Sequence, residues 1–234
     1  MANRVGEFVV WDVGLGAAAN ALAVFRAMQN LSIQLRLVSF DDTIEPLRFA
    51  LEHSEELGFL AGYEPALRQL LARRQISFAT GAGAVTWQLE LADFPALLAG
   101  STAHALPKPD AILFDPYSPA RNPAMWTLRL FADLFRPLDP ERPCALATYS
   151  RSTMTRVALL LAGFYVGRGE ATGSKEETTI AANTRDLIGA PLDSRWLERA
   201  RRSHSAEPLR NPTYTQQPLS LDTWEELLAH PQFR

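Results

Sequence analysis

A proline-rich loop holds the residue types best suited to chemistry. It follows the apolar run Ala111-Ile112-Leu113-Phe114, which is typical of a buried strand, and has the sequence Asp115-Pro116-Tyr117-Ser118-Pro119-Ala120-Arg121-Asn122-Pro123-Ala124-Met125-Trp126. Ligands bind outside the carboxyl ends of the strands in open α/β sheets. A carboxylate there can accept hydrogens from an amine, and an aromatic ring can pack on a flat acceptor. We therefore expect Asp115 and Tyr117 to face a polar acceptor.

A second candidate site is the glycine-rich turn that follows the first apolar run. It has the sequence Asp12-Val13-Gly14-Leu15-Gly16-Ala17-Ala18-Ala19-Asn20. Glycines between a strand and a helix let the backbone approach a ligand closely. An acid at this strand end would repel a pyrophosphate, but it suits the ammonium group in the amino-acid part of S-adenosylmethionine. An ordinary tight turn is the alternative interpretation.

Two more acids follow predicted strands. Asp41 comes at the end of the second strand, where a carboxylate can accept both ribose hydroxyls. Asp93 comes after the third, where it can accept a hydrogen bond from an adenine amino group. Capping of the next helix by Asp41, Asp42 or Asp93 is the alternative in each case.

Methyl transfer to an amine would explain these features together. A methyl donor is a strong electrophile, so the enzyme must mainly aim the amine lone pair at the methyl carbon. The acid and aromatic residue of the loop could do this. The alternative is that Pro116, Pro119 and Pro123 only shape a loop and cap a helix.

Strands and helices alternate along most of the chain. Hydrophobic periodicity predicts strands at 8–13, 34–40, 85–91, 110–115, 144–149, 164–168 and 178–182, and helices at 17–28, 46–57, 64–74, 124–135 and 153–162. This alternation predicts an α/β fold with a mostly parallel, doubly wound sheet and helices on both faces. The last two strands are too close for a crossover helix, so we expect an antiparallel C-terminal hairpin. Such a hairpin is typical of the Rossmann-like class I methyltransferase fold, whereas a dehydrogenase sheet is parallel throughout.

Charge and composition limit the possible domain organisation, location and partners. The 234 residues carry a net charge of −3, which does not exclude a local basic patch. We predict a methyltransferase domain at 1–188 and an extension of loop and short helices at 189–234, with a last helix at 222–229 capped by Asp222. The single cysteine, the absence of a long apolar run and the scattered histidines predict a cytoplasmic protein with no disulfide, membrane span or metal.

Arginines could supply a phosphate-binding surface. Candidates are Arg195, Arg199, Arg201 and Arg202 in the extension, with Arg121, Arg151 and Arg156 near the cleft. The alternative is that these arginines form an ordinary solvated helix face.

The motifs together resemble the methyltransferase domain of the bifunctional tRNA 5-methylaminomethyl-2-thiouridine biosynthesis proteins. That family has an acid-x-Gly-Phe-Gly-Thr-Gly-x-Asn turn, Phe-Glu and Gly-Asp at the next two strand ends, and Asp-Gly-Phe-x-Pro-x-Lys-Asn-Pro-x-Met-Trp at the fourth. The matching segments here are 12–20, Phe40-Asp41, Ala92-Asp93 and 115–126. The resemblance extends over residues 8–182.

The resemblance implies a seven-stranded sheet, S-adenosylmethionine as cofactor, and N-methylation of an aminomethyl group on a wobble uridine in tRNA. Asp115 and Tyr117 would face the amine. The implied cofactor-binding residues are Asp12, Gly14, Gly16, Asn20, Asp41 and Asp93. The implied substrate-binding residues are Pro116, Arg121, Asn122, Trp126 and Lys175.

Departures from the family pattern keep two other functions open. Ala18 replaces the third glycine of the turn, and we expect its Cβ to tighten the cofactor pocket. This alanine-rich turn favours a catalytically degenerate binding or regulatory relative. The acidic net charge favours a methyltransferase of the same fold that acts on a small-molecule or protein amine.

Overall fold

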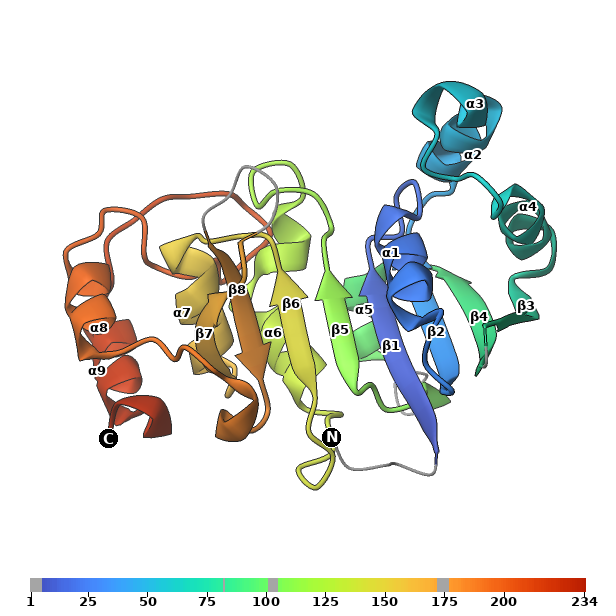
Figure 1. The fold of residues 1–234 in the computed structure, drawn as a ribbon. Helices are drawn as coiled ribbons and strands as arrows, with labels where there is room; N and C mark the ends of the chain where they lie inside the picture. Colours follow the sequence, from blue (N-terminus) through green and yellow to red (C-terminus); the bar gives the residue numbers. More distant parts are fainter. Residues whose placement is uncertain (1–5, 82, 101–104, 172–176) are drawn as a thin grey trace. The chain divides into compact units, whose positions relative to one another are not determined.

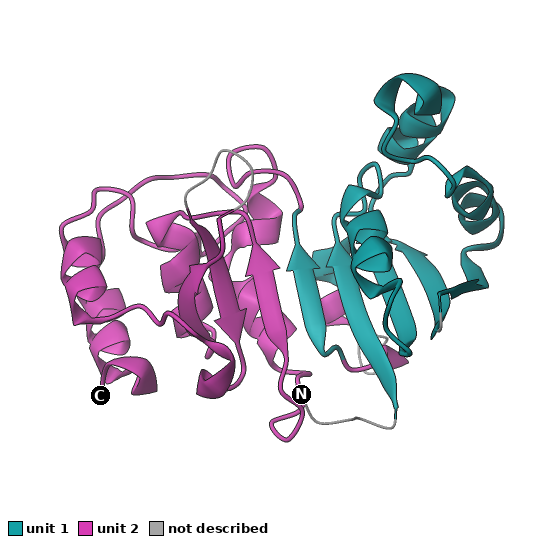
Figure 2. Ribbon diagram, in the orientation of Figure 1, with its two compact units in different colours: residues 1–96, 109–115 teal, residues 97–108, 116–234 magenta. Residues whose placement is uncertain are grey.

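Two compact units make up the chain (Figure 2). The computed structural model describes residues 6–81, 83–100, 105–171 and 177–234. Unit 1 comprises residues 1–96 and 109–115, and unit 2 comprises residues 97–108 and 116–234. The proposed boundary between a methyltransferase domain and an extension at residue 188 stays a prediction.

Unit 1 is built on five strands in the order β3-β4-β2-β1-β5 (Figure 1). Their bounds are β1 Glu7–Val13, β2 Gln34–Asp41, β3 Gln75–Thr80, β4 Gly83–Leu91 and β5 Ala111–Phe114. Pairings between β1 and β2, β1 and β5, and β2 and β4 are parallel, and β3 pairs antiparallel with β4. Val13 lies opposite both Phe40 and Phe114. The ends of β1, β2 and β5 therefore meet at one edge, as the sequence predicted.

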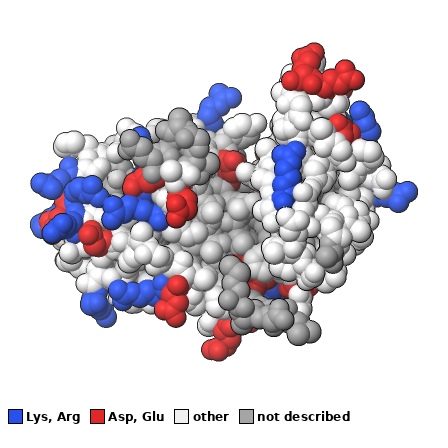
Figure 3. All heavy atoms as spheres, in the orientation of Figure 1, with Lys and Arg blue, Asp and Glu red and all other residues white. Residues whose placement is uncertain are grey.

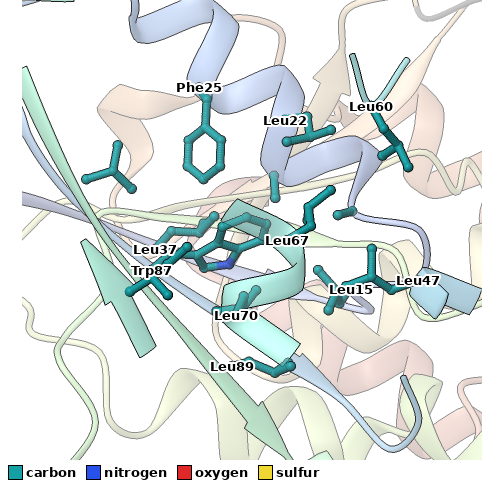
Figure 4. Packing of buried hydrophobic residues seen from close by; sticks show 14 of the residues in the cluster. Leu15, Leu22, Phe25, Leu37, Leu47, Leu60, Leu67, Leu70, Trp87 and Leu89 are labelled. Atoms are coloured by element: carbon teal, nitrogen blue, oxygen red, sulfur yellow. The ribbon is translucent and has the colours of Figure 1, made fainter. Parts of the chain in front are cut away.

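Helices follow the strands of unit 1. They are α1 Ala19–Met28, α2 Glu45–Glu52, α3 Ser54–Leu57 and α4 Glu64–Arg73, and α5 Phe94–Ala99 runs from unit 1 into unit 2. Phe25 of α1 meets the indole of Trp87 on β4 edge-on, with the ring centroids 5.0 Å apart. Figure 4 shows Leu37, Leu67 and Phe25 gathered about this indole. Burial of these side chains is the main stabilisation of unit 1.

Unit 2 contains the predicted antiparallel hairpin. Its strands are β6 Ala145–Thr148, β7 Tyr165–Gly169 and β8 Thr178–Ala182, in the order β6-β8-β7, and both pairings are antiparallel. Its helical segments are η2 Pro123–Trp126, α6 Leu128–Phe135, α7 Thr153–Leu161, η3 Arg185–Leu187, α8 Ser194–Arg201, α9 Leu221–Ala229 and η4 Pro231–Phe233. No helix among the described residues is long and apolar enough to cross a membrane.

Several elements differ from the predicted ones. The described residues form eight strands, one more than predicted, because the edge strand β3 was not anticipated. The helix predicted at 46–57 divides into α2 and α3 at His53. The helix predicted at 124–135 divides because Thr127 is extended and its hydroxyl caps α6. The cap of α9 is Ser220, whose hydroxyl accepts the Thr223 N–H, and Asp222 lies inside the first turn.

Candidate active site

Asp12 lies inside unit 1, next to the end of β1. Its side chain is fully buried, and Oδ2 accepts a hydrogen bond from the Ser39 hydroxyl at 2.8 Å. Ser39 Oγ in turn accepts from the indole Nε1 of Trp87 at 2.9 Å, which links the carboxylate to the hydrophobic core. Oδ1 of Asp12 is buried with no hydrogen-bond partner in the described part of the chain. A buried acceptor left unpaired is costly, so this oxygen is suited to a ligand donor.

The pKa of the Asp12 carboxyl is raised to about 7, chiefly by burial. The Ser39 hydrogen bond opposes this shift, and the nearby negative charges of Asp115 and Asp41 add to it. Three carboxylates from three strand ends therefore interact electrostatically within unit 1. A cationic ligand at this edge would relieve their mutual repulsion.

The glycine turn is held against the end of β2. The N–H groups of Gly14 and Leu15 both donate to the Phe40 carbonyl, at 2.9 and 3.2 Å. The Gly16 N–H donates to Oδ2 of Asp41 at 2.9 Å. A Cβ built on Gly16 would meet no atom within 4 Å, so the turn leaves open space there. The turn thus leaves open space beside an acid, as a cofactor site requires.

Asp41 also forms a turn with the residues that follow it. Its Oδ1 accepts the Thr43 N–H at 3.2 Å, while α2 begins after Ile44 without a side-chain cap. Burial raises the pKa of Asp41, and the hydrogen bonds from Gly16 and Thr43 oppose the shift. A carboxylate has about four acceptor positions, so Asp41 can still accept hydroxyl donors.

Ala18 has a backbone conformation that favours glycine. Its φ and ψ are 65° and 17°, in the left-handed region, immediately before α1. This conformation costs a non-glycine residue about 1 kcal/mol. Its methyl group is fully buried in the hydrophobic cluster with Leu22 and Phe25. The expectation that this Cβ would tighten the cofactor pocket stays a prediction.

Asp115 and Asn20 are brought together although they are distant in sequence. Asn20 lies in the first turn of α1, and its Nδ2 donates to Oδ2 of Asp115 at 3.3 Å. The Asp115 N–H donates to the Val13 carbonyl at 2.9 Å, which extends the parallel pairing beyond β5. The predicted cofactor residue and the predicted catalytic acid are therefore neighbours.

The loop after Asp115 belongs to unit 2 and is stiffened by its own hydrogen bonds. Pro116 is buried, whereas Tyr117 is 62% exposed and has a φ of 55°, which is rare for an aromatic residue. Trp126, only 1% exposed, donates from Nε1 to the Tyr117 carbonyl at 3.1 Å. The N–H groups of Arg121 and Asn122 both donate to the Ser118 carbonyl. The buried indole thus holds the loop in place.

The structure gives less information on the remaining predicted site residues. Asp93 is exposed, and its Oδ1 accepts the Ala96 N–H at 2.8 Å, so it does cap α5 as the alternative proposed. Its contact with adenine stays a prediction, as do substrate contacts of Pro116, Arg121, Asn122 and Trp126. Lys175 lies outside the described residues.

Arg156 was expected near the cleft, but the structure buries it. Its guanidinium donates to the Thr179 hydroxyl, the Thr178 carbonyl and Glu177. This buried pairing satisfies the charge within unit 2, so Arg156 is unavailable to a phosphate. Among the described residues no group of acids, histidines and cysteine could hold a metal ion.

Comparisons with known proteins show the family to which the chain belongs. A family model of S-adenosyl-L-methionine-dependent methyltransferases matches residues 59–184, more than half of the chain. The chain belongs to this family. The methyltransferase is 29% identical over 204 residues to the tRNA 5-methylaminomethyl-2-thiouridine biosynthesis bifunctional protein MnmC of Cupriavidus necator, covering 82% of this chain and 30% of that relative. For MnmC of Ralstonia nicotianae the identity is 31% over 185 residues, covering 75% and 27%.

The methyltransferase thus spans less than a third of these MnmC relatives. Among solved structures, MNMC2 from Aquifex aeolicus matches with a TM-score of 0.63 at 22% identity, covering 95% of this chain and 67% of that one. This likeness concerns the fold, and it confirms the predicted Rossmann-like methyltransferase architecture. The predicted S-adenosylmethionine dependence is confirmed by the family match.

The residues of unit 1 fit the cofactor of this family. The unpartnered Oδ1 of Asp12 and the open space at Gly16 lie at the same turn, and Asp41 stands beside it. Sequence reasoning missed Ser39 and Trp87, which hold Asp12. A serine inside the apolar run 35–40 was the one available signal, because a buried hydroxyl needs a partner.

Replacing Asp41 by alanine is expected to weaken S-adenosylmethionine binding about tenfold or more. The change removes a predicted ribose acceptor and the hydrogen bond that holds the Gly16 N–H. Calorimetric titration would measure it, with exposed Asp42→Ala as the matched control. Equal affinities for both variants would contradict a cofactor role of Asp41.

Proposed function

We propose that this methyltransferase methylates the amino nitrogen of an aminomethyl group on a wobble uridine in tRNA. S-adenosylmethionine, when bound, supplies the electrophilic methyl group. The amine nitrogen forms the new bond to the methyl carbon as the carbon–sulfur bond breaks, and the nitrogen then releases a proton. The observation that carries the proposal is Asp115, fixed by Asn20 beside the cofactor turn and followed by the exposed ring of Tyr117.

Asp115 would orient the amine. A carboxylate accepts hydrogens from the amine nitrogen and so directs the lone pair away from itself, toward the methyl carbon. The hydrogen bond from Asn20 at 3.3 Å restrains the carboxylate in one orientation. Restraint matters because orientation is the main task in methyl transfer to an amine.

Tyr117 would supply a face for the uracil ring. Its side chain is 62% exposed although its carbonyl accepts a hydrogen bond from Trp126, so a restrained backbone presents a solvent-facing ring. Stacking of a base on an aromatic side chain contributes about 1–3 kcal/mol. The left-handed backbone at Tyr117 fits the observation that strained residues collect at functional sites.

Exposed arginines of unit 2 support a nucleic-acid partner. Figure 3 shows basic side chains gathered over α8. The exposed arginines of this helix and its end are Arg195, Arg199, Arg201 and Arg202. Trp196, Leu197 and Ala200 bury the opposite face of α8. Basic side chains on one helix face can neutralise phosphates, which gives affinity without sequence specificity.

A methyl-transfer assay tests the proposed function. We expect labelled methyl groups to enter tRNA that carries the unmethylated aminomethyl uridine, but not tRNA in which this amine is already methylated. Cofactor binding is measured in parallel by calorimetry. Normal cofactor binding with no transfer to this tRNA would refute the proposal. Equal transfer to the free aminomethyl nucleoside would favour a small-molecule acceptor instead.

A further inference from the structure

A hollow of about 530 Å³ lies in unit 1, at the junction of α4 and β3 and beside the last residues of β4. Its lining residues are Arg73, Arg74, Gln75, Gln88, Leu89, Glu90 and Leu91. Arg73 and Arg74 directly precede Gln75, the first residue of the edge strand β3. Gln75 pairs with Gln88 of β4 in the antiparallel register. The volume falls within the range of small-molecule sites.

Arg74 has a buried donor that the described residues leave unsatisfied. Its Nη1 is buried without a hydrogen-bond partner, and none of the ion pairs in the described part of the chain involves Arg73 or Arg74. The acid in the hollow, Glu90, accepts instead from the Gln88 amide. A buried guanidinium donor is costly unless an acceptor reaches it.

The backbone of Arg74 is in a conformation that favours glycine. Its φ of 64° and ψ of −14° make it the left-handed residue that ends α4, and its carbonyl accepts the Leu89 N–H at 2.7 Å. Glycine is the usual residue at such a helix end. The chain has an arginine there in spite of the backbone cost, which is consistent with use of its side chain.

The lining fits a nucleotide better than a bare anion. The guanidinium groups of Arg73 and Arg74, both in the lining, suit a phosphate. Leu91 is 41% exposed and offers an apolar surface to a sugar or base, and Glu90 is an acceptor for sugar hydroxyls. Leu91 pairs with Asp41 on the neighbouring strand, which places the hollow next to the cofactor side of unit 1.

We propose that this hollow binds a phosphate-bearing nucleotide of the RNA acceptor, with Arg74 and Arg73 holding the phosphate. The inference rests on the proposed function, because it takes RNA as the acceptor. The hollow would give the protein a further contact with the RNA, separate from the contacts at the aminomethyl group and at α8.

The first test measures tRNA binding by Arg74→Gln, with Arg68→Gln as the matched control. Arg68 is exposed on α4 outside the hollow. We expect Arg74→Gln to raise the Kd for tRNA about tenfold at roughly 0.1 M salt and to reduce the salt slope by about 1. Arg68→Gln should bind within about twofold of wild type. Arg74→Gly, which suits the left-handed backbone, should lose the same affinity without loss of stability.

The second test does not depend on methyl transfer. The side-chain NMR signals of ¹⁵N-arginine-labelled protein are followed during titration with uridine monophosphate and with uridine. We expect the Arg74 signal to shift with the monophosphate only. A shift of the Arg74 signal with the monophosphate, in a protein that does not methylate tRNA, would support nucleotide binding in the hollow and refute the proposed function. No shift, together with equal tRNA binding by the Gln variants, would overturn the inference. Weakened S-adenosylmethionine binding by Arg74→Gln would also overturn it, because the hollow would then serve the cofactor.

Discussion

Replacing Asp12 by asparagine is expected to stabilise the protein at pH 8 and to weaken S-adenosylmethionine binding. The folded-state pKa of about 7 lies above the ordinary value of 3.8, so the folded state binds more protons between these values. Wild-type stability should therefore fall as the pH rises from about 4 to about 7. Three pKa units correspond to roughly 4 kcal/mol. Asparagine keeps an acceptor for Ser39 but leaves a buried donor, which costs about 1–3 kcal/mol. We expect a net gain of about 2 kcal/mol at pH 8 and a loss at pH 4.

Urea unfolding followed by tryptophan fluorescence at pH 4 and pH 8 would measure this change. Asp42→Asn is the matched control because Asp42 is an exposed acid that follows the neighbouring strand β2. The same difference in unfolding free energy between Asp12→Asn and wild type at both pH values would show that Asp12 titrates normally. Calorimetry on the same variant should show at least about tenfold weaker cofactor binding. A more stable variant with unchanged cofactor affinity would mean that Asp12 has no ligand role.

A variant that is more stable at pH 8 but binds the cofactor more weakly would place stability and function in opposition at Asp12. Asp12, Asp41 and Asp115 interact unfavourably at one edge of unit 1. A protein selected for stability alone would not collect three acids around a buried position. Binding of a cation would turn this repulsion into attraction, and active sites commonly show this exchange of stability for function.

The convergence of these acids could be predicted from the sequence because it follows from simple rules of strand burial and strand direction. Buried parallel strands are recognisable as apolar runs, and an acid directly after such a run must lie at the carboxyl edge. Asp41 and Asp115 follow this rule, and Asp12 lies one residue before its strand ends. The antiparallel pairing of β7 with β8 was predictable from the short connection alone.

Other features depend on contacts that no local pattern encodes. Strand β3 has six residues and buries one of them, Ile76, so it lacks the row of buried apolar residues by which a core strand is recognised. The chain of hydrogen bonds from Trp87 through Ser39 to Asp12 requires the register of three strands. Burial of Arg156 depends on Glu177 and Thr179, which lie more than twenty positions away. A lone arginine in a helical segment cannot indicate such partners.

Replacing Asp115 by asparagine is expected to lower kcat for methyl transfer about 10²–10³-fold while cofactor binding persists. Asparagine can still accept the Asn20 hydrogen bond, so the local structure should survive. It loses the charge and the acceptor capacity that orient the amine, and orientation accounts for much of the catalysis. Single-turnover transfer to the proposed tRNA acceptor would measure this. Asn20→Ala, which removes one hydrogen bond to the carboxylate but keeps its charge, should cost about tenfold or less at saturating cofactor. A kcat for Asp115→Asn within threefold of wild type would exclude Asp115 as the orienting group.

The same variant offers an independent readout through Asp12. The negative charge of Asp115 contributes to the raised pKa of Asp12, so Asp115→Asn should lower that pKa. If Asp12 must be ionised to bind the cofactor, wild-type affinity should weaken as the pH falls below about 7, and in the variant this loss should begin at a lower pH. Calorimetric titrations across pH 5 to 8 would locate both midpoints. A reduced kcat without a shifted midpoint would separate the role of Asp115 toward the amine from its electrostatic effect on Asp12. A shifted midpoint with unchanged kcat would show that Asp115 tunes the cofactor site and does not orient the acceptor.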